Sequence, residues 1–232
     1  MGTLFVVATP IGNLEDITCR AIRILSEVDL IAAEDTRQTR ILLTKYNINT
    51  PLTSYHKFNI KTKTAQLITF LKQGQNLALV SDSGMPGVSD PGHELIRESV
   101  DQNIRVEVIP GPSAAITALV VSGLPTDKFV FEGFLPKKPG KKRKLLKELS
   151  KEERTIIIYE SPFRVLKTIE DIRAVIGDRQ IAVCREMTKK FEEIIRGKAG
   201  DVLEKIKDRK IKGEVVVVVA GANQAAQRER AS

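Results

Sequence analysis

Residues 77–92 read LALVSDSGMPGVSDPG, and this stretch decides the fold class. Its short apolar beginning is typical of a buried β-strand. Residues 80–92 then bring together three glycines, two prolines, two aspartates and three serines. Glycine permits a positive φ or the close approach of a ligand, whereas proline fixes a turn. We therefore predict a strand that ends in a rigid small-molecule pocket. The simpler alternative is a tight surface loop in which Asp82 and Asp90 only cap turns.

The same succession of apolar run and helical segment extends in both directions along the chain. Short runs rich in Val and Ile alternate with longer segments of helical period, which predicts an α/β fold with mostly parallel strands. The expected strands are residues 4–8, 30–33, 77–81, 105–109, 129–133, 155–159, 181–185, 191–197 and 214–220. The expected helices are residues 17–28, 36–46, 61–72, 94–102, 114–121, 143–149, 164–176 and 202–210.

The chain length and two apolar segments indicate two domains. The 232 residues fit one large domain or two compact ones of about 100 residues each, and two domains would leave a cleft between them. Residues 214–221, EVVVVVAG, are apolar at successive positions, which predicts a central strand covered on both faces. Residues 114–123, AAITALVVSG, predict a buried helix where the domains meet. The turn that follows sets the expected domains at residues 1–123 and 124–223, before a polar tail at 224–232.

A concentrated run of positive charge indicates a polyanionic partner. The formal net charge is +8, and residues 137–147 hold seven basic residues and no acidic one. Because Pro139 and Gly140 interrupt this run, we expect a flexible arm and not a packed helix face. A solvated loop that only aids solubility is the alternative. The candidate residues for binding such a polyanion, which would be RNA if the family resemblance described below holds, are Lys137, Lys138, Lys141, Lys142, Arg143 and Lys144.

Other features of the sequence exclude several classes of protein. Cys19 and Cys184 have no paired spacing, so neither a disulfide framework nor a zinc ribbon is expected. His56 and His93 lack further metal ligands at suitable spacing, and we expect no metal. Neither phosphate-binding motif, G-x-x-x-x-G-K-[ST] or G-x-G-x-x-G after a strand, is present in the sequence. This disfavours nucleoside triphosphate hydrolysis and dinucleotide binding. The N-terminal apolar run LFVVA is too short for a signal peptide or a membrane span, so we expect a cytoplasmic protein.

Four loops of unusual composition follow predicted strands. They are ATPIGNL (residues 8–14), SDSGMPGVSDPG (81–92), PGPSA (110–114) and YESPFR (159–164). In open parallel α/β sheets, ligands bind beyond the carboxyl ends of the strands, which is where these loops are expected to lie. Their shared position predicts a binding site.

Seven ordered segments together resemble the tetrapyrrole methylase superfamily, and in particular its members that act on ribosomal RNA. These segments are ATPIGNLEDIT, AAEDTRQT, SDSGMPGVSDPG, PGPSA, GFLP, YESPFR and KGEVVVVV, and the resemblance spans about residues 2–222. It implies two α/β domains with S-adenosylmethionine in the cleft between them, usually in a homodimer. It also implies 2′-O-ribose methylation of a cytidine in small-subunit (16S) ribosomal RNA. Relatives that act on tetrapyrroles commonly carry Gly-Asp-Pro where this chain has Ser81, Asp82 and Ser83.

The resemblance also assigns cofactor-binding positions in both expected domains, the first with the glycine-rich cofactor loop and the second completing the cleft. The implied cofactor-binding residues are Pro10, Ser81, Asp82, Ser83, Gly84, Met85, Ser113, Ala114, Glu160 and Met187.

Methyl transfer to a ribose hydroxyl requires close positioning of donor and acceptor. It also requires either a base that accepts the hydroxyl proton or a cation beside the developing alkoxide. AAEDTRQT offers Glu34, Asp35 and Arg37, and YESPFR offers Glu160 and Arg164. We expect Asp35 or Glu160 to handle the proton, and Arg37 and Arg164 to contact RNA phosphate or the reacting ribose. The simpler alternatives are helix caps and a solvated arginine.

Two further groups of residues are open to two interpretations each. Arg185, Glu186 and Thr188 are either cleft residues or part of a structural ion pair. Tyr55, Phe58 and Phe134 are either stacking partners for bases or core residues.

Two rival functions remain open. A methyltransferase of the same fold could act on a small tetrapyrrole, which would leave the basic run without a purpose. A non-enzymatic RNA-binding protein could retain vestigial cofactor loops, and stoichiometric binding of S-adenosylmethionine would count against it.

Overall fold

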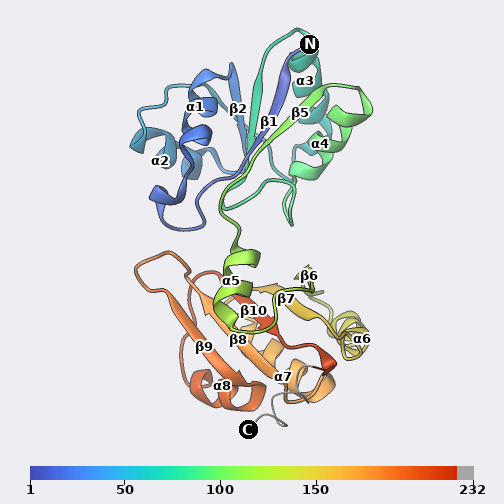
Figure 1. Ribbon diagram of the computed structural model, residues 1–232. Coiled ribbons are helices and arrows are strands. Elements are labelled where there is room, and N and C mark those ends of the chain that lie inside the picture. Colours follow the sequence, from blue (N-terminus) through green and yellow to red (C-terminus); the bar gives the residue numbers. More distant parts are fainter. Residues whose placement is uncertain (224–232) are drawn as a thin grey trace. The chain divides into compact units, whose positions relative to one another are not determined.

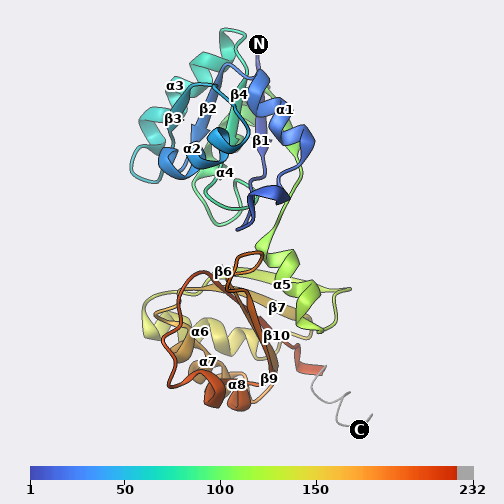
Figure 2. The ribbon, with the colours of Figure 1, turned by 90° about the vertical axis from the view of Figure 1, so that its left-hand side faces the viewer.

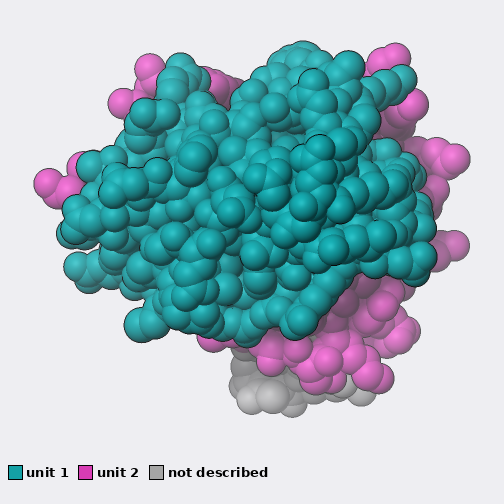
Figure 3. Space-filling view, turned by 90° about the horizontal axis from the view of Figure 1, so that it is seen from above, with its two compact units in different colours: residues 1–113 teal, residues 114–232 magenta. Residues whose placement is uncertain are grey.

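The computed structural model describes residues 1–223, which form two compact α/β units (Figure 1). The first unit comprises Met1–Ser113 and the second begins at Ala114, as the two colours of Figure 3 indicate. This division lies ten residues before the expected one at residue 123, because the apolar helix α5 (Ala114–Ser122) packs on the strands of the second unit. The expected polar tail, residues 224–232, lies outside the described residues.

The first unit is built on a fully parallel sheet in the order β3-β2-β4-β1-β5. Its strands are β1 (Thr3–Val7), β2 (Leu30–Ala33), β3 (Leu52–Ser54), β4 (Leu77–Val80) and β5 (Arg105–Ile109). The short edge strand β3 was not predicted, because its three half-buried residues form no apolar run.

Helices cover both faces of the first sheet. α1 (Cys19–Glu27) and α2 (Thr36–Lys45) pack on one face, and α3 (Ile60–Lys72) and α4 (Gly92–Asp101) pack on the other (Figure 1). A short 3₁₀ helix, η1 (Leu14–Asp16), precedes α1. The apolar run LALV, residues 77–80, forms strand β4. It is apolar at every position because successive side chains point to opposite faces of the sheet and each face is covered by helices.

The second unit is built on a mixed sheet in the order β6-β7-β10-β8-β9. Its strands are β6 (Phe129–Phe134), β7 (Thr155–Glu160), β8 (Gln180–Arg185), β9 (Glu193–Lys198) and β10 (Val215–Val219). The pair β6–β7 is parallel, whereas β10 runs antiparallel to both of its neighbours and β8 runs antiparallel to β9. The predicted α/β class is confirmed, and within residues 1–223 parallel pairings are the majority, although the second sheet is mixed.

Strand β10 occupies the centre of the second sheet and all five of its residues are buried, which confirms the sequence prediction. α6 (Pro139–Leu149), α7 (Val165–Val175) and α8 (Ala199–Ile206) cover one face, and α5 covers the other (Figure 2). The prediction of a wholly buried α5 is only partly right. Its Ala118 is buried, but Ile116 and Val120 are exposed.

The basic run forms a helix, so the predicted flexible arm is wrong. Pro139 stands in the first turn of α6, where its missing N–H costs no hydrogen bond and its fixed φ favours the helix. Leu146 and Leu149 then pack into the core of the second unit. No helix among residues 1–223 is long and apolar enough to cross a membrane.

Candidate functional site

The loops that follow β1 and β4 are joined at the carboxyl edge of the first sheet. Thr9 and Gly84 exchange two backbone hydrogen bonds, with N···O distances of 2.9 and 3.1 Å. The Thr9 hydroxyl also donates to the carbonyl oxygen of Ser81, at 3.0 Å. Because all strands of this sheet are parallel, the loops after β1, β2, β4 and β5 emerge at one edge. The expected shared position of these strand-end loops is confirmed within the first unit.

The glycine-rich loop is fixed by Asp90. One oxygen of the Asp90 carboxylate accepts hydrogen bonds from the backbone N–H groups of Gly87 and Gly92, at 2.7 and 2.8 Å. Gly84 and Gly87 have positive φ angles of 79° and 87°, a conformation that favours glycine. Burial raises the pKa of Asp90. Asp90 therefore fits the simpler interpretation of a turn-capping residue, and it holds the loop in a set shape.

Asp82 connects the glycine-rich loop to the end of β2. Its carboxylate accepts a hydrogen bond from the backbone N–H of Asp35 at 2.9 Å. Glu34 lies in the same region, and its pKa is raised by burial and by the negative charges of Asp82 and Asp90. The sequence pattern named Glu34 but gave it no role, because its neighbours lie far away in the sequence. These carboxylates make this part of the sheet edge favourable for a cationic ligand.

Asp35 and Arg37 form a tight local pair at the start of α2. The Asp35 carboxylate accepts the Arg37 backbone N–H at 2.8 Å, which caps the helix, and also the guanidinium Nη2 at 2.7 Å. Hydrogen bonds from the Arg37 side chain lower the pKa of Asp35 to about 2. The capping interpretation thus describes the geometry of Asp35. The Arg37 side chain remains 89% exposed and can contact a ligand.

Glu160 lies at the end of β7 in the second unit, and its side chain has no exposed surface. Its carboxylate accepts from the Thr168 hydroxyl at 2.6 Å and from the Ser161 backbone N–H at 2.8 Å. The Arg164 Nε lies 3.4 Å away and forms an ion pair with it. Arg164 also donates to the carbonyl oxygen of Leu135 at 3.0 Å. The buried carboxylate therefore holds the ESPFR turn together, a structural task that the sequence pattern did not predict.

Met187 is buried in a turn whose neighbours have unusual backbone angles. Glu186 and Thr188 have positive φ values of 48° and 64°, which non-glycine residues rarely adopt. Such angles cluster at functional sites. The Glu186 carboxylate is paired with Lys189 at 3.0 Å, and Arg185 is paired with Glu193 at 2.8 Å. These pairs match the structural alternative for Arg185 and Glu186.

The PGPSA segment passes close to β1. A side chain at Gly111 would come within 2.9 Å of the Ala8 Cβ, so only glycine fits there without displacement. Ser113 and Ala114, the two implied cofactor-binding residues of this segment, are half-buried, and the division between the units falls between them. Pro10, in the loop after β1, is buried.

The predicted aromatic stacking residues differ in their environments. Tyr55 is 1% exposed and bonds to Thr64 at 2.9 Å, so it belongs to the core. Phe58 is 84% exposed and Phe134 is 58% exposed. Of these three residues, Phe58 and Phe134 present a ring to a ligand.

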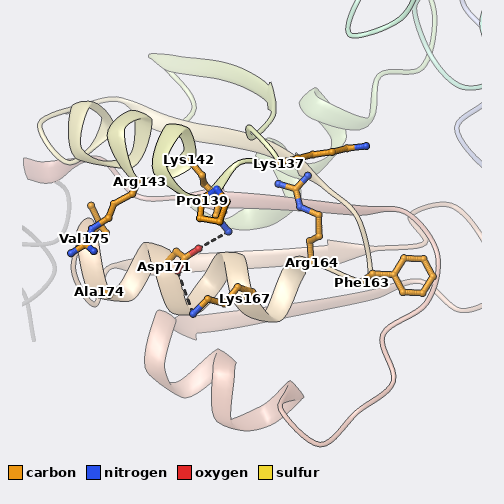
Figure 4. Close-up of a pocket in the computed structure, with 10 residues that line it drawn as sticks. All are labelled: Lys137, Pro139, Lys142, Arg143, Phe163, Arg164, Lys167, Asp171, Ala174 and Val175. Carbon is orange, nitrogen blue, oxygen red and sulfur yellow. Dashed lines mark ion pairs between the residues drawn. The ribbon is translucent and has the colours of Figure 1, made fainter.

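The six candidate RNA-binding residues do not share one environment. Lys142 is buried and its Nζ lies 2.5 Å from a carboxylate oxygen of Asp171 on α7 (Figure 4). The other five are exposed: Lys137, Lys138, Lys141, Arg143 and Lys144. Among residues 1–223, no group of three or more His, Cys, Asp or Glu side chains is arranged to hold a metal ion.

Comparison with known proteins adds three findings. Residues 3–203 match the family described as Tetrapyrrole (Corrin/Porphyrin) Methylases. Ribosomal RNA small subunit methyltransferase I of Thermotoga maritima is 50% identical over 222 residues, which cover 95% of this chain and 99% of the relative. The Bacillus subtilis protein of the same name is 48% identical over 223 residues, which cover 96% and 76%.

A solved structure shows the same fold. Uroporphyrin-III C-methyltransferase from Thermus thermophilus, complexed with S-adenyl homocysteine, matches with a TM-score of 0.68 at 16% identity. The match covers 96% of this chain and 99% of that one. At this identity the likeness concerns the fold alone.

Proposed function

We infer that this chain, which belongs to the tetrapyrrole methylase family over residues 3–203, is a methyltransferase that uses S-adenosylmethionine to methylate small-subunit ribosomal RNA. The observation that carries this conclusion is the 50% identity, over almost the whole length of both chains, to a ribosomal RNA small subunit methyltransferase I. The acceptor that we propose is the 2′-hydroxyl of a cytidine in 16S ribosomal RNA. The basic α6 segment supports an RNA acceptor over a small tetrapyrrole.

Several features of the first unit suit S-adenosylmethionine, which supplies an electrophilic methyl group on a sulfonium cation. The positive φ of Gly84 lets backbone groups approach a ligand closely, and Asp82 and Glu34 bring negative charge to the same sheet edge. We propose that the first unit contributes the glycine-rich cofactor loop and that the second unit supplies the remaining contacts. The proposed cofactor-binding residues are Pro10, Ser81, Asp82, Ser83, Gly84, Met85, Ser113, Ala114, Glu160 and Met187.

In the reaction, the ribose oxygen attacks the methyl carbon, the carbon–sulfur bond breaks, and the hydroxyl proton passes to a base. We propose Glu34 as this base in preference to Asp35 or Glu160. A pKa of about 2 makes Asp35 a weak proton acceptor, and the Glu160 carboxylate is enclosed by its own donors. The raised pKa of Glu34 brings it nearer to neutral pH, where a general base works best.

The remaining site residues have positioning or RNA-binding roles in this proposal. Arg37, with its exposed guanidinium, contacts RNA phosphate or the reacting ribose, and Arg164 acts in the same way from the ESPFR turn. Asp35 orients Arg37, and Glu160 orients Arg164. Of the six cations predicted to bind RNA, the five exposed ones bind phosphate, whereas Lys142 is engaged with Asp171.

We also propose that the protein acts as a homodimer in the cytoplasm. The exposed Ile116 and Val120, one turn apart on α5, are apolar side chains that an interface would cover. Light scattering at the monomer and dimer masses tests the oligomeric state directly.

Methyl transfer from radiolabelled S-adenosylmethionine to small ribosomal subunits that lack the modification tests the function. The labelled nucleotide is then mapped, and attachment to base or ribose is determined by mass spectrometry. Label on one cytidine ribose is the expected result. A protein that binds the cofactor but transfers no label to RNA would contradict the RNA acceptor, and a protein that does not bind the cofactor would contradict the enzymatic function.

A further inference from the structure

A groove separates α6 from α7 on the second unit (Figure 4). Its cavity volume is about 530 Å³, within the range of roughly 300–1,000 Å³ that is usual for pockets that bind small ligands. Lys137 and Arg143 line it from the α6 side, and Phe163, Arg164 and Lys167 line it from the α7 side. Nothing in the cofactor site described above uses Phe163 or Lys167.

The groove carries a surplus of positive charge. Five of its lining side chains are cationic, and Asp171 is the single carboxylate among them. Asp171 is already shared by Lys142 at 2.5 Å and Lys167 at 3.5 Å. Lys167 is also paired with Glu170 at 3.0 Å, and Arg164 is paired with Glu160 at 3.4 Å. Within residues 1–223, no ion pair engages Lys137 or Arg143. The groove is therefore electrostatically complementary to an anion of more than one charge.

The floor of the groove is part of the folded core. The ion pair between the buried Lys142 and the partly exposed Asp171 connects α6 to α7. Leu146 on α6 and Ile169 on α7 pack in the same core cluster. A ligand thus meets a groove whose width is already set, and binding costs less ordering of the protein.

One aromatic ring stands at the rim without a packing role. Phe163 is 91% exposed, and the turn that carries it is held by a hydrogen bond from its backbone N–H to the Ser161 hydroxyl at 3.3 Å. Figure 4 shows Phe163 at one end of the groove and Arg143 at the other, with Arg164 between them. An exposed ring beside cations matches the combination by which proteins bind single-stranded nucleic acid, with bases stacked on rings and phosphates on cations.

The groove adjoins the ESPFR turn through Arg164. This guanidinium lines the cavity and is also paired with Glu160 at the end of β7. A ligand in the groove therefore lies next to a residue that we assign to the reacting ribose.

We propose that the α6–α7 groove binds a single-stranded RNA segment that flanks the methylated nucleotide. One base stacks on Phe163, and the adjoining phosphates lie on Lys137, Arg143 and Lys167. This inference rests on the proposed function, because it assigns the groove to the same RNA acceptor.

Binding of a fluorescent single-stranded RNA decamer, measured by anisotropy with the full chain, tests the groove without any need for catalysis. Phe163→Ala should weaken binding about fivefold or more, because one stacked base is lost. Arg143→Ala should weaken binding and lower the slope of log Kd against log salt by about 0.7, the value for one phosphate contact. Lys147→Ala is the matched control, since Lys147 is an exposed cation on α6 outside the groove, and it should bind like the wild type.

The outcomes separate this inference from the proposed function. If Phe163→Ala and Arg143→Ala bind the decamer as Lys147→Ala does, the groove is not an RNA site, whether or not the wild type methylates ribosomal subunits. If cytidine monophosphate or a duplex of equal length displaces the decamer at the same concentration as the unlabelled decamer, the ligand is a free nucleotide or a duplex, and the single-strand proposal is overturned. If the variants lose affinity while the wild type methylates no RNA, the groove proposal stands and the proposed function fails.

Discussion

Replacing Glu160 tests whether its carboxylate has a structural or a catalytic role. Its side chain has no exposed surface, accepts hydrogen bonds from Thr168 and Ser161, and forms an ion pair with Arg164. A hydrogen bond to a charged group is worth about 1.5–3 kcal/mol, and the removal of one partner of a buried ion pair costs about 3–5 kcal/mol. Because Arg164 is 26% exposed and can turn toward water, we expect Glu160→Ala to cost about 3 kcal/mol in the free energy of unfolding.

Two milder variants should lower the free energy of unfolding by smaller amounts, against which the loss in Glu160→Ala can be compared. Glu160→Gln keeps the shape and one acceptor oxygen, so it should cost about 1.5–3 kcal/mol. Thr168→Val removes only the hydroxyl donor and should cost about 1–2 kcal/mol. Urea denaturation of the full chain gives the free energies, provided that the transition is two-state.

Enzyme kinetics on the folded Glu160→Gln protein then decides the role of the residue. As a positioning residue it should lose less than about tenfold in kcat, whereas a general base should lose about a hundredfold or more. A large loss of kcat with unchanged stability would refute our reasoning and return Glu160 to the position of proton acceptor. A large loss of stability with little change in kcat supports the structural role.

The acidic groups of the first unit give three further predictions. In wild-type protein, kcat should fall as the pH is lowered through the raised pKa of Glu34. Glu34→Gln should lose about a hundredfold or more in kcat, and a pH–rate profile of this variant that matches wild type would exclude the residue as base. Asp35 should stabilise the fold above its ordinary pKa of 3.8, and this contribution should disappear as the pH falls toward 2. Urea titrations at several pH values should show no such loss in the free energy of unfolding for Asp35→Asn. Asp82→Ala should weaken binding of S-adenosylhomocysteine about tenfold, since a hydrogen bond that orders the loop is lost, and equal affinities in calorimetry would contradict this role.

The strands that the sequence predicts best are those covered on both faces. β4 and β10 are continuous apolar runs, and both lie within their sheets with every residue buried. β3 escaped prediction because an edge strand of three half-buried residues lacks such a run. The mixed second sheet could not be predicted either, since apolar runs indicate where strands occur but not their direction. The seven residues between β8 and β9 allow a hairpin, where a parallel pair would need a longer crossover.

The error at α6 has a specific local cause. A proline inside a basic run was interpreted as an interruption, yet the same residue favours a helix when it stands at the first helical position. The deciding information lies further along, in Leu146 and Leu149, which bury one face of the helix. The partner of Lys142 could not be predicted from the basic run, because Asp171 lies on another helix.

The adjacent residues Glu34 and Asp35 show why loops at strand ends are predictable while the roles of their side chains are not. Both follow β2, and both carry a carboxylate that the sequence alone cannot distinguish. Asp35 meets the guanidinium of Arg37 within its own helix turn, which lowers its pKa to about 2. Glu34 is half-buried near Asp82 and Asp90 from the loop after β4, and this burial and the two negative charges raise its pKa. The proton-accepting role that we propose for Glu34 therefore depends on the pairing of the neighbouring parallel strands β2 and β4, and a local sequence motif contains only half of that information.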